Sequence, residues 1–192
     1  MPAFFARPRH AIAAFARAKR GATAVEFAIV VLPFLVLLFA ILELGAVFMV
    51  STSLEDATDR AARQIRTGEF QTSGATTKAD FVNLVCSRMT WLSTSCTANL
   101  SVDVRTFTSF QTASQAQKVS GANFDKTKTC WATGQPSDIV LVRAFYEWKL
   151  FTPMLDASLV NMGNNKRLIT SVATFRNEPY NNNAPAGASA CP

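Results

Sequence analysis

The chain has 192 residues, enough for one domain or for a small domain plus a membrane anchor. Its formal charge of +6 comes mainly from five basic residues that precede Ala22 with no acidic residue among them. Without those five, 14 Lys and Arg residues face 13 Asp and Glu residues, for a formal charge of +1. The composition therefore does not support a nucleic-acid-binding class.

Residues 1–21 are rich in Ala and Arg and carry no pattern that would form a core. Such a stretch could be an amphipathic targeting peptide for an organelle. The long apolar run directly after it favours a basic leader that stays in the cytoplasm.

The apolar run covers residues 27–50, which contain a single charge, Glu43. As a helix it would be about 36 Å long at about 1.5 Å per residue, enough to cross a hydrocarbon core of about 30 Å. Basic residues precede the run and acidic residues follow it, which predicts a cytoplasmic N-terminus and an outer C-terminal part. We assign residues 22–50 as a transmembrane helix. We expect Glu43 at the outer interface; the alternative is pairing with a polar group on a partner protein.

The helix is predicted to continue through residues 51–68 as an exposed amphipathic segment. Its apolar side chains recur at helical spacing, at Leu54, Ala57, Ala61 and Ile65. Asp56 and Arg60 form an acid-before-base pair four residues apart, and Gly68 is a suitable terminator. This stripe could cover one face of a sheet in the domain that follows.

Residues 69–192 are predicted to form the head domain. A helix should begin at Thr77, with Asp80 three residues later, and carry Cys86, while Cys96 should lie in a loop. Alternating patterns predict strands at 100–105, 138–148 and 168–176, and a short helix at 152–160 is possible. The polar stretch 108–137 is expected to be a long surface loop with room for a short element. The expected fold is α+β: a long N-terminal transmembrane helix that extends into a small head with an antiparallel sheet of about three strands and short helices.

All four cysteines, Cys86, Cys96, Cys130 and Cys191, follow the apolar run. They allow three disulfide connectivities. The short separation favours Cys86 with Cys96, which would leave Cys130 and Cys191 to fasten the C-terminal tail. The chain has no CxxC pair and its one histidine, His10, precedes the apolar run, so we expect neither a metal site nor a cofactor.

Nothing in the head indicates catalysis or a small-molecule substrate. It has no histidine, no nucleophile motif and no glycine-rich phosphate loop, so we expect no enzyme activity and no catalytic residues. The scattered acidic residues Asp103, Asp125, Asp138 and Glu147 are interpreted as solvated surface charges. Trp131, Trp148 and Tyr180 could form an exposed adhesive patch, although Trp148 is better placed in the core.

The junction between the leader and the apolar run combines a glycine with a carboxylate placed five residues later, at the edge of the apolar helix. Gly21 would let a protease approach the bond to Ala22 without hindrance from a side chain. Glu26 and Phe27 follow, and a carboxylate at the edge of a lipid-embedded helix costs about a few kcal/mol unless it is paired or reaches the interface. A cut before Ala22 would create an amine one helical turn from Glu26, or on a neighbouring subunit. Alternatively, Glu26 is a solvated charge in the headgroup region.

The pattern Gly-x-x-x-x-Glu-Phe ahead of one apolar helix resembles the processing site of type IV prepilins, in the variant of tight-adherence (Flp) pili. Residues 24–33 and 42–45 resemble the start and the end of the segment found in TadE-like minor pilins, or pseudopilins. Residues 138–142, the Tyr146-x-Trp148 pair and residues 176–180 are similar to the later part of that family.

The resemblance implies that an aspartic prepilin peptidase cuts between Gly21 and Ala22. It also implies that Glu26 pairs with the N-terminal amine of an adjacent subunit, and that the protein promotes assembly of a pilus built mostly from a smaller pilin, for adhesion and biofilm formation. Pro33 would bend the helix, because it removes a backbone donor and crowds the preceding turn. Expected partners are the peptidase, other pilins, an assembly platform and lipid, with the head in the periplasm and the helix in the inner membrane.

Two other interpretations remain at this stage. The chain could be an unprocessed single-span protein that anchors a periplasmic binding or adaptor domain. It could also be a secreted protein with an ordinary signal peptide, but the apolar run is too long for that and no Ala-x-Ala site follows it.

Overall fold

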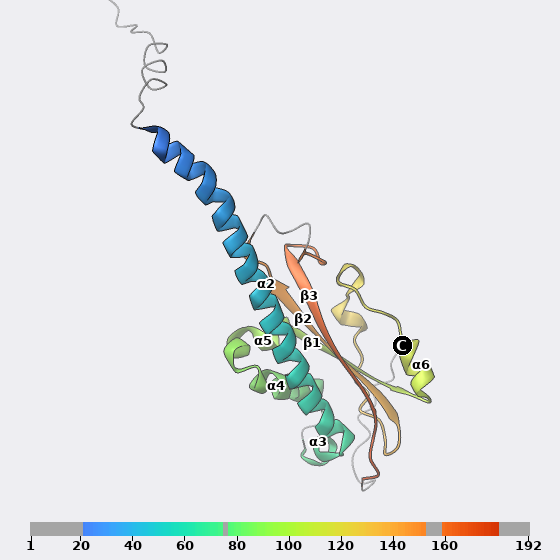
Figure 1. Cartoon of the computed structure of the whole chain (residues 1–192). Coiled ribbons are helices and arrows are strands. Elements are labelled where there is room, and N and C mark those ends of the chain that lie inside the picture. Colours follow the sequence, from blue (N-terminus) through green and yellow to red (C-terminus); the bar gives the residue numbers. More distant parts are fainter. Residues whose placement is uncertain (1–20, 75–76, 153–158, 181–192) are drawn as a thin grey trace, which may run out of the picture. The chain divides into compact units, whose positions relative to one another are not determined.

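The computed structural model describes residues 21–74, 77–152 and 159–180. The chain divides into two compact units, Met1–Leu42 and Glu43–Pro192. One helix, α2 (Ala22–Arg66), contributes residues to both units. Figure 1 shows α2 followed by the short helices and the sheet of the second unit, here called the head.

Helix α2 runs through Pro33 and ends at Arg66, close to the predicted end. Gly68 follows with φ 77°, and its N–H donates to the carbonyl of Ile65. A Cβ atom at Gly68 would lie 2.4 Å from Cγ of Tyr180, so the turn requires glycine for both its conformation and the close approach of the tyrosine ring.

Three short helices follow α2. They are α3 (Glu69–Thr72), α4 (Lys78–Arg88) and α5 (Ser93–Asn99). The predicted start of α4 is confirmed by a capping box, in which the Thr77 hydroxyl accepts from the Asp80 N–H and the Asp80 carboxylate accepts from the Thr77 N–H. The expectation that Cys96 lies in a loop is wrong, because α5 carries it.

The head contains one antiparallel sheet of three strands in the order β1-β2-β3. The strands are β1 (Leu100–Phe107), β2 (Ile139–Lys149) and β3 (Lys166–Arg176), so all three predicted strands are confirmed. In the register, Val104 lies opposite Val142. The long helix, the small head and its sheet with short helices confirm the predicted α+β fold.

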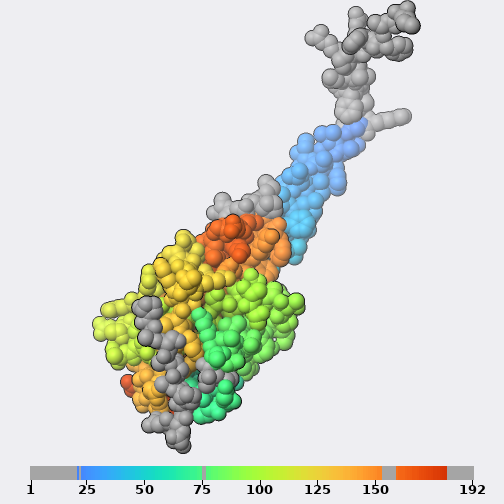
Figure 2. Space-filling view, turned by 180° about the vertical axis from the view of Figure 1, so that it is seen from behind, coloured from blue at the N-terminus to red at the C-terminus, as the bar shows by residue number. Residues whose placement is uncertain are grey.

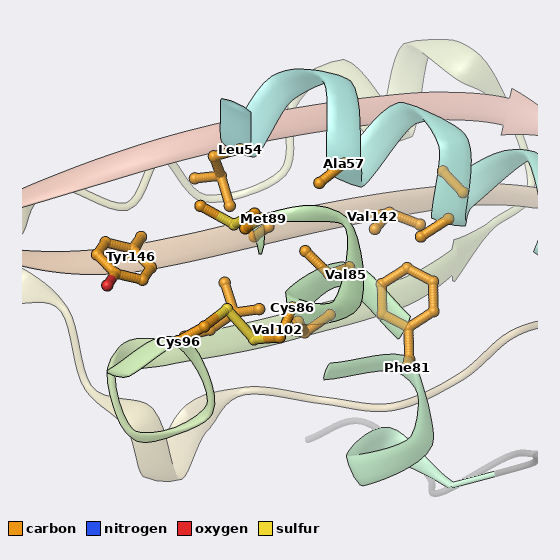
Figure 3. Packing of buried hydrophobic residues seen from close by; sticks show 14 of the residues in the cluster. Leu54, Ala57, Phe81, Val85, Cys86, Met89, Cys96, Val102, Val142 and Tyr146 are labelled. Atoms are coloured by element: carbon orange, nitrogen blue, oxygen red, sulfur yellow. A yellow bond between two sulfur atoms is a disulfide. The ribbon is translucent and has the colours of Figure 1, made fainter. Parts of the chain in front are cut away.

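One face of the sheet forms the main core. Its buried positions alternate along β1 and β2, at Val102, Val104, Val140, Val142, Ala144 and Tyr146. The predicted stripe of α2 belongs to the same core, together with Phe81 and Val85 of α4. Figure 3 shows Leu54 and Ala57 of α2 above Met89 and Val142, with the Cys86–Cys96 disulfide below. The prediction that this stripe covers a face of the sheet is therefore confirmed.

On the opposite face of the sheet, the segment between β1 and β2 covers residues of β1 and β2, whereas Thr170, Val172 and Thr174 of β3 stay exposed. This segment contains α6 (Phe110–Ser114) and two 3-10 turns, η3 (Gly121–Asn123) and η4 (Lys126–Lys128). The rings of Phe124 and Phe145 lie 4.9 Å apart, and Arg143 donates to the carbonyl of Gln117. Figure 2 shows the surface of this segment, in yellow, against the orange residues of the sheet. The expected polar loop is thus a layer of short elements packed on the sheet.

Three side chains expected at the surface are buried. Trp131 is 7% exposed and contacts the rings of Phe70 and Phe81, which excludes it from an exposed adhesive patch. Asp103 and Glu147, which were interpreted as solvated charges, are also buried. Each of them is paired with basic side chains, and this pairing offsets the cost of burial.

Candidate functional site

The junction residues lie at the beginning of α2. Gly21 directly precedes the helix, is exposed, and has no neighbouring atom within 4 Å of the position a Cβ would take. Phe27 is 68% exposed. The backbone around Gly21 is therefore sterically open within the part of the chain that the structure describes.

Glu26 lies one turn into α2 and is exposed. Among the described residues, no hydrogen bond or ion pair reaches its carboxylate. The carboxylate is thus available to a group from another molecule, which is the arrangement that pairing with an external amine requires.

The following turns of α2 present apolar side chains on all sides. The exposed large apolar residues before the head are Val25, Phe27, Ile29, Val30, Leu32, Phe34, Leu35, Leu37, Leu38, Phe39, Ile41 and Leu42. The segment Thr23–Arg66 is long and apolar enough to cross a membrane. A helix that is apolar all round suits a lipid or a bundle of like helices, and this one fits a single-pass anchor.

Pro33 lies inside this apolar stretch, and α2 continues on both sides of it. Proline has no N–H, so the helix lacks the hydrogen bond to the carbonyl of Ile29. That carbonyl could accept a hydrogen bond from a neighbouring helix.

Glu43 is the first residue of the head and is only 3% exposed. Its carboxylate accepts hydrogen bonds from the N–H of Phe151 at 2.9 Å, from the N–H of Thr152 at 3.1 Å and from the Thr152 hydroxyl at 3.2 Å. Trp148 Nε1 also donates to it, at 3.4 Å. The chain after β2 folds back and supplies these donors, so the partners of Glu43 among the described residues belong to the head itself. Its position at the outer interface stays a prediction.

The sequence contains a signal for this burial. Glu43 is in helical phase with the buried residues Val50, Leu54 and Ala57, so it lies on the face of α2 that the head covers. A charged residue on the same helix face as buried apolar residues needs polar partners. Here the turn after β2 supplies them.

Trp148 and Phe151 lie beside Glu43, and a third aromatic side chain, Trp91, contacts Trp148. The ring centroids of Trp148 and Phe151 are 5.5 Å apart, and those of Trp91 and Trp148 are 6.5 Å apart. We call Trp91, Trp148 and Phe151 the aromatic cluster. Trp148 packs against the core but is not fully buried, whereas Trp91 and Phe151 are exposed.

A disulfide joins Cys86 of α4 to Cys96 of α5, the pair that the short separation favours. Its two Cα atoms are 5.6 Å apart. Cys130 is also disulfide-bonded, and Cys191 lies outside the described residues. The Cys86–Cys96 bond holds α4 and α5 together beneath α2 (Figure 3).

A buried charge cluster occupies the second face of the sheet. Asp103 accepts from Arg143 Nε at 2.9 Å, from Arg105 Nε at 3.1 Å and from the Cys130 N–H at 2.7 Å. Asp103 and Arg143 are direct partners in the β1–β2 register, so their opposite charges are a signal that sequence reasoning missed. The cluster fastens the covering segment to the sheet, because Arg105 and Arg143 also bind carbonyls of that segment.

Glu147 forms a second ionic group with Lys126 and Lys166. Burial alone would raise the pKa of Glu147, but hydrogen bonds and charge from the two lysines outweigh it and hold the pKa below its ordinary value. The carboxylate is therefore ionised and paired at neutral pH, which is a structural arrangement and does not provide a general acid. Within the described ranges, no group of three or more His, Cys, Asp or Glu residues is placed to hold a metal ion.

Comparison with known proteins gives one match. Residues 21–63 match the family model described as TadE-like protein. No curated protein and no solved structure matches the chain. The matched range begins at Gly21, includes Glu26 and Glu43, and ends three residues before α2 does. The resemblance inferred from the sequence is confirmed over this range: residues 21–63 are similar to TadE-like proteins, the family of the tight-adherence (Flp) pilus system.

Proposed function

We propose that this protein is a TadE-like minor pilin, or pseudopilin, which a prepilin peptidase cuts between Gly21 and Ala22. The mature protein then takes part in assembly of a tight-adherence pilus, which serves adhesion and biofilm formation. Its contribution is structural and involves no reaction on a small molecule. Its partners are the peptidase, other pilin subunits, the assembly platform of the inner membrane, and lipid.

One observation carries this proposal. The TadE-like match starts at Gly21, and the carboxylate of Glu26 five residues later has no partner among the described residues. A lone carboxylate in an apolar helix costs about a few kcal/mol in lipid, so its presence calls for an external partner. The amine that a cut at Gly21 creates on a neighbouring chain has the complementary charge.

The rest of α2 supports the same function. The apolar side chains before Glu43 surround the helix, and the described residues of the head do not bury them. In the membrane they contact lipid, and in a filament they contact the helices of other subunits. The basic leader keeps the N-terminus cytoplasmic and the head periplasmic, and its removal lowers the charge that would otherwise be drawn into a helix bundle.

Mass spectrometry of the protein isolated from its native membrane tests the cut. We expect a mature N-terminus at Ala22. An intact leader would contradict the proposal and favour the anchored adaptor, and an N-terminus beyond Gly45 would indicate secretion. Gly21→Leu should leave the precursor uncut, whereas Gly45→Leu, a matched change at an exposed glycine of the same helix, should be processed normally.

The pairing of Glu26 has a separate test. Glu26→Ala should be cut at the normal position but should reduce the number of pili per cell by at least tenfold. Glu55→Ala, which removes an exposed carboxylate further along α2, is the control and should leave piliation unchanged. Normal piliation by the Glu26→Ala variant would remove the pairing role.

A further inference from the structure

The aromatic cluster places two large apolar side chains at the surface of the head. Phe151 is 72% exposed and Trp91 is 48% exposed, and both flank the half-covered Trp148. Exposed apolar residues that gather in this way mark a surface with a partner.

Hydrogen bonds hold the cluster against α2. Glu43 accepts from the N–H of Phe151 and from Trp148 Nε1, and Trp91 Nε1 donates to the hydroxyl of Ser53 at 3.1 Å. Both indole N–H groups therefore have a partner within the head. The apolar surface of the rings stays exposed while their polar groups are hydrogen-bonded. Aromatic residues at membrane–water interfaces have the same combination.

The position of the cluster along α2 identifies the partner. Residues 22–42 form about 31 Å of helix at about 1.5 Å per residue, close to the hydrocarbon thickness of about 30 Å. Glu43, the next residue, is the first that binds the cluster. The cluster thus begins where a helix that starts at Ala22 would leave the hydrocarbon.

Basic residues lie at the same end of the sheet. The β2–β3 register places Arg167 opposite Trp148, so these two residues lie on the same face of the sheet. Lys149 and Lys166 form the next pair and lie on the other face, where Lys166 binds Glu147. A basic side chain next to an aromatic ring suits the phosphate groups and the acyl boundary of a lipid leaflet. A protein partner would explain the apolar rings but not why they begin at this point of the helix.

We propose that Trp148 and Phe151 of the aromatic cluster form a lipid-binding surface, which rests in the headgroup layer of the outer leaflet and sets the depth of α2 in the membrane. Phe151 lies deepest, next to the end of the hydrocarbon. Trp91 is bound to Ser53, about 15 Å further along the helix, and lies on the outer side of the headgroup layer. This inference rests on the membrane-anchored state in the proposed function. Its consequence is that the head is held against the bilayer before assembly.

Fluorescence quenching in vesicles tests the proposal. The full chain is reconstituted into vesicles of phosphatidylcholine and phosphatidylglycerol, with bromine on the acyl chain near the headgroup. The Trp91→Phe/Trp148→Phe background leaves the buried Trp131 as a constant reference. Phe151→Trp in this background is the reporter.

Phe110→Trp in the same background is the matched control. Phe110 is also an exposed phenylalanine, but it follows Phe107, which pairs with Ile139 at the far end of β2 from Trp148. We expect the brominated lipid to quench the Phe151→Trp reporter at least twofold more than the Phe110→Trp control. Equal quenching of the two would overturn the proposal, as would a Phe151→Trp emission that shifts to the blue in assembled pili but resists lipid quenching.

Flotation of the vesicles separates the two proposals. A chain that does not float with the vesicles would contradict membrane anchoring itself, and with it both proposals. A chain that floats with equal quenching at the two positions would contradict only the lipid-binding surface. Circular dichroism in the near ultraviolet confirms that each variant keeps its tertiary structure.

Discussion

The carboxylate of Glu43 binds both the backbone N–H and the hydroxyl of Thr152, a residue 109 positions further along the chain. This contact joins the helix that enters the head to the turn that follows β2. Thr152 gives the buried charge two donors, the N–H of Phe151 adds a third, and together they fix the start of the head on α2. The first prediction concerns this contact.

Glu43→Ala should destabilise the head by about 2 kcal/mol, because it removes the acceptor of the part-buried N–H groups of Phe151 and Thr152. Thermal unfolding of the reconstituted chain should show a melting temperature about 4–8 °C lower. Glu55→Ala, an exposed change on the same helix, should stay within about 0.5 kcal/mol. Equal melting temperatures for the two variants would show that the contact contributes nothing.

Gly68→Ala should destabilise the head by more than about 2 kcal/mol, because a positive φ costs about 1–2 kcal/mol for a residue with a Cβ and the new atom would strike the ring of Tyr180. Gly74→Ala, with φ 81° but open space around it, isolates the backbone cost. Gly163→Ala, at ordinary φ and with open space, should be nearly neutral. The expected order of stability in urea unfolding is Gly163→Ala, then Gly74→Ala, then Gly68→Ala; equal losses at Gly68 and Gly74 would exclude the steric contribution.

Replacing Cys86 and Cys96 together by alanine should lower the free energy of unfolding by about 2–3 kcal/mol, since the bond closes a short loop. The double variant should still respond to dithiothreitol, because Cys130 is also disulfide-bonded. Melting curves with and without the reductant measure both effects. A double variant as stable as the parent would show that packing of Phe81, Val85 and Met89 alone holds these helices.

The stability of the head should fall in acid through Glu147. The folded pKa of this carboxyl lies below its ordinary value of 4.5, so its pairing with Lys126 and Lys166 contributes fully above pH 4.5 and is lost as the pH falls through the folded pKa. Urea unfolding from pH 7 to pH 3 should therefore show a smaller decline for Glu147→Gln than for the parent. An identical decline would show that the pairing of Glu147 does not cause the acid sensitivity.

Local patterns were enough to predict α2, α4 and the three strands, but not the short helices α3, α5 and α6. The 3.6-residue spacing of Leu54, Ala57, Ala61 and Ile65 identified the buried side of α2, and Thr77 with Asp80 identified the start of α4. Alternation along residues 138–148 identified β2 and its two faces. These features are visible in sequence because each depends on neighbours within a few residues.

The polar pairs could not be predicted in the same way. The sequence next to Asp103 and Glu147 does not differ from the sequence next to an exposed carboxylate. The pairing of β1 with β2 brings Arg143 to Asp103. The pairing of β2 with β3 brings Lys166 to Glu147. Trp131 became a core residue for the same reason, because Phe70 and Phe81 come to it from distant parts of the chain.

The sequence by itself determined the basic leader, the apolar span, the Gly21–Glu26 motif and the α+β class, because charge, hydropathy and periodicity are properties of the chain. Only the tertiary structure decided that Glu43 is buried, that Trp148 and Phe151 lie beside it, and that Trp91 contacts Trp148. The physical reason is that a charge can be buried, and aromatic rings can meet, only where distant segments of the chain supply donors and contacts. The path of the chain after β2 and the strand register decide which segments these are.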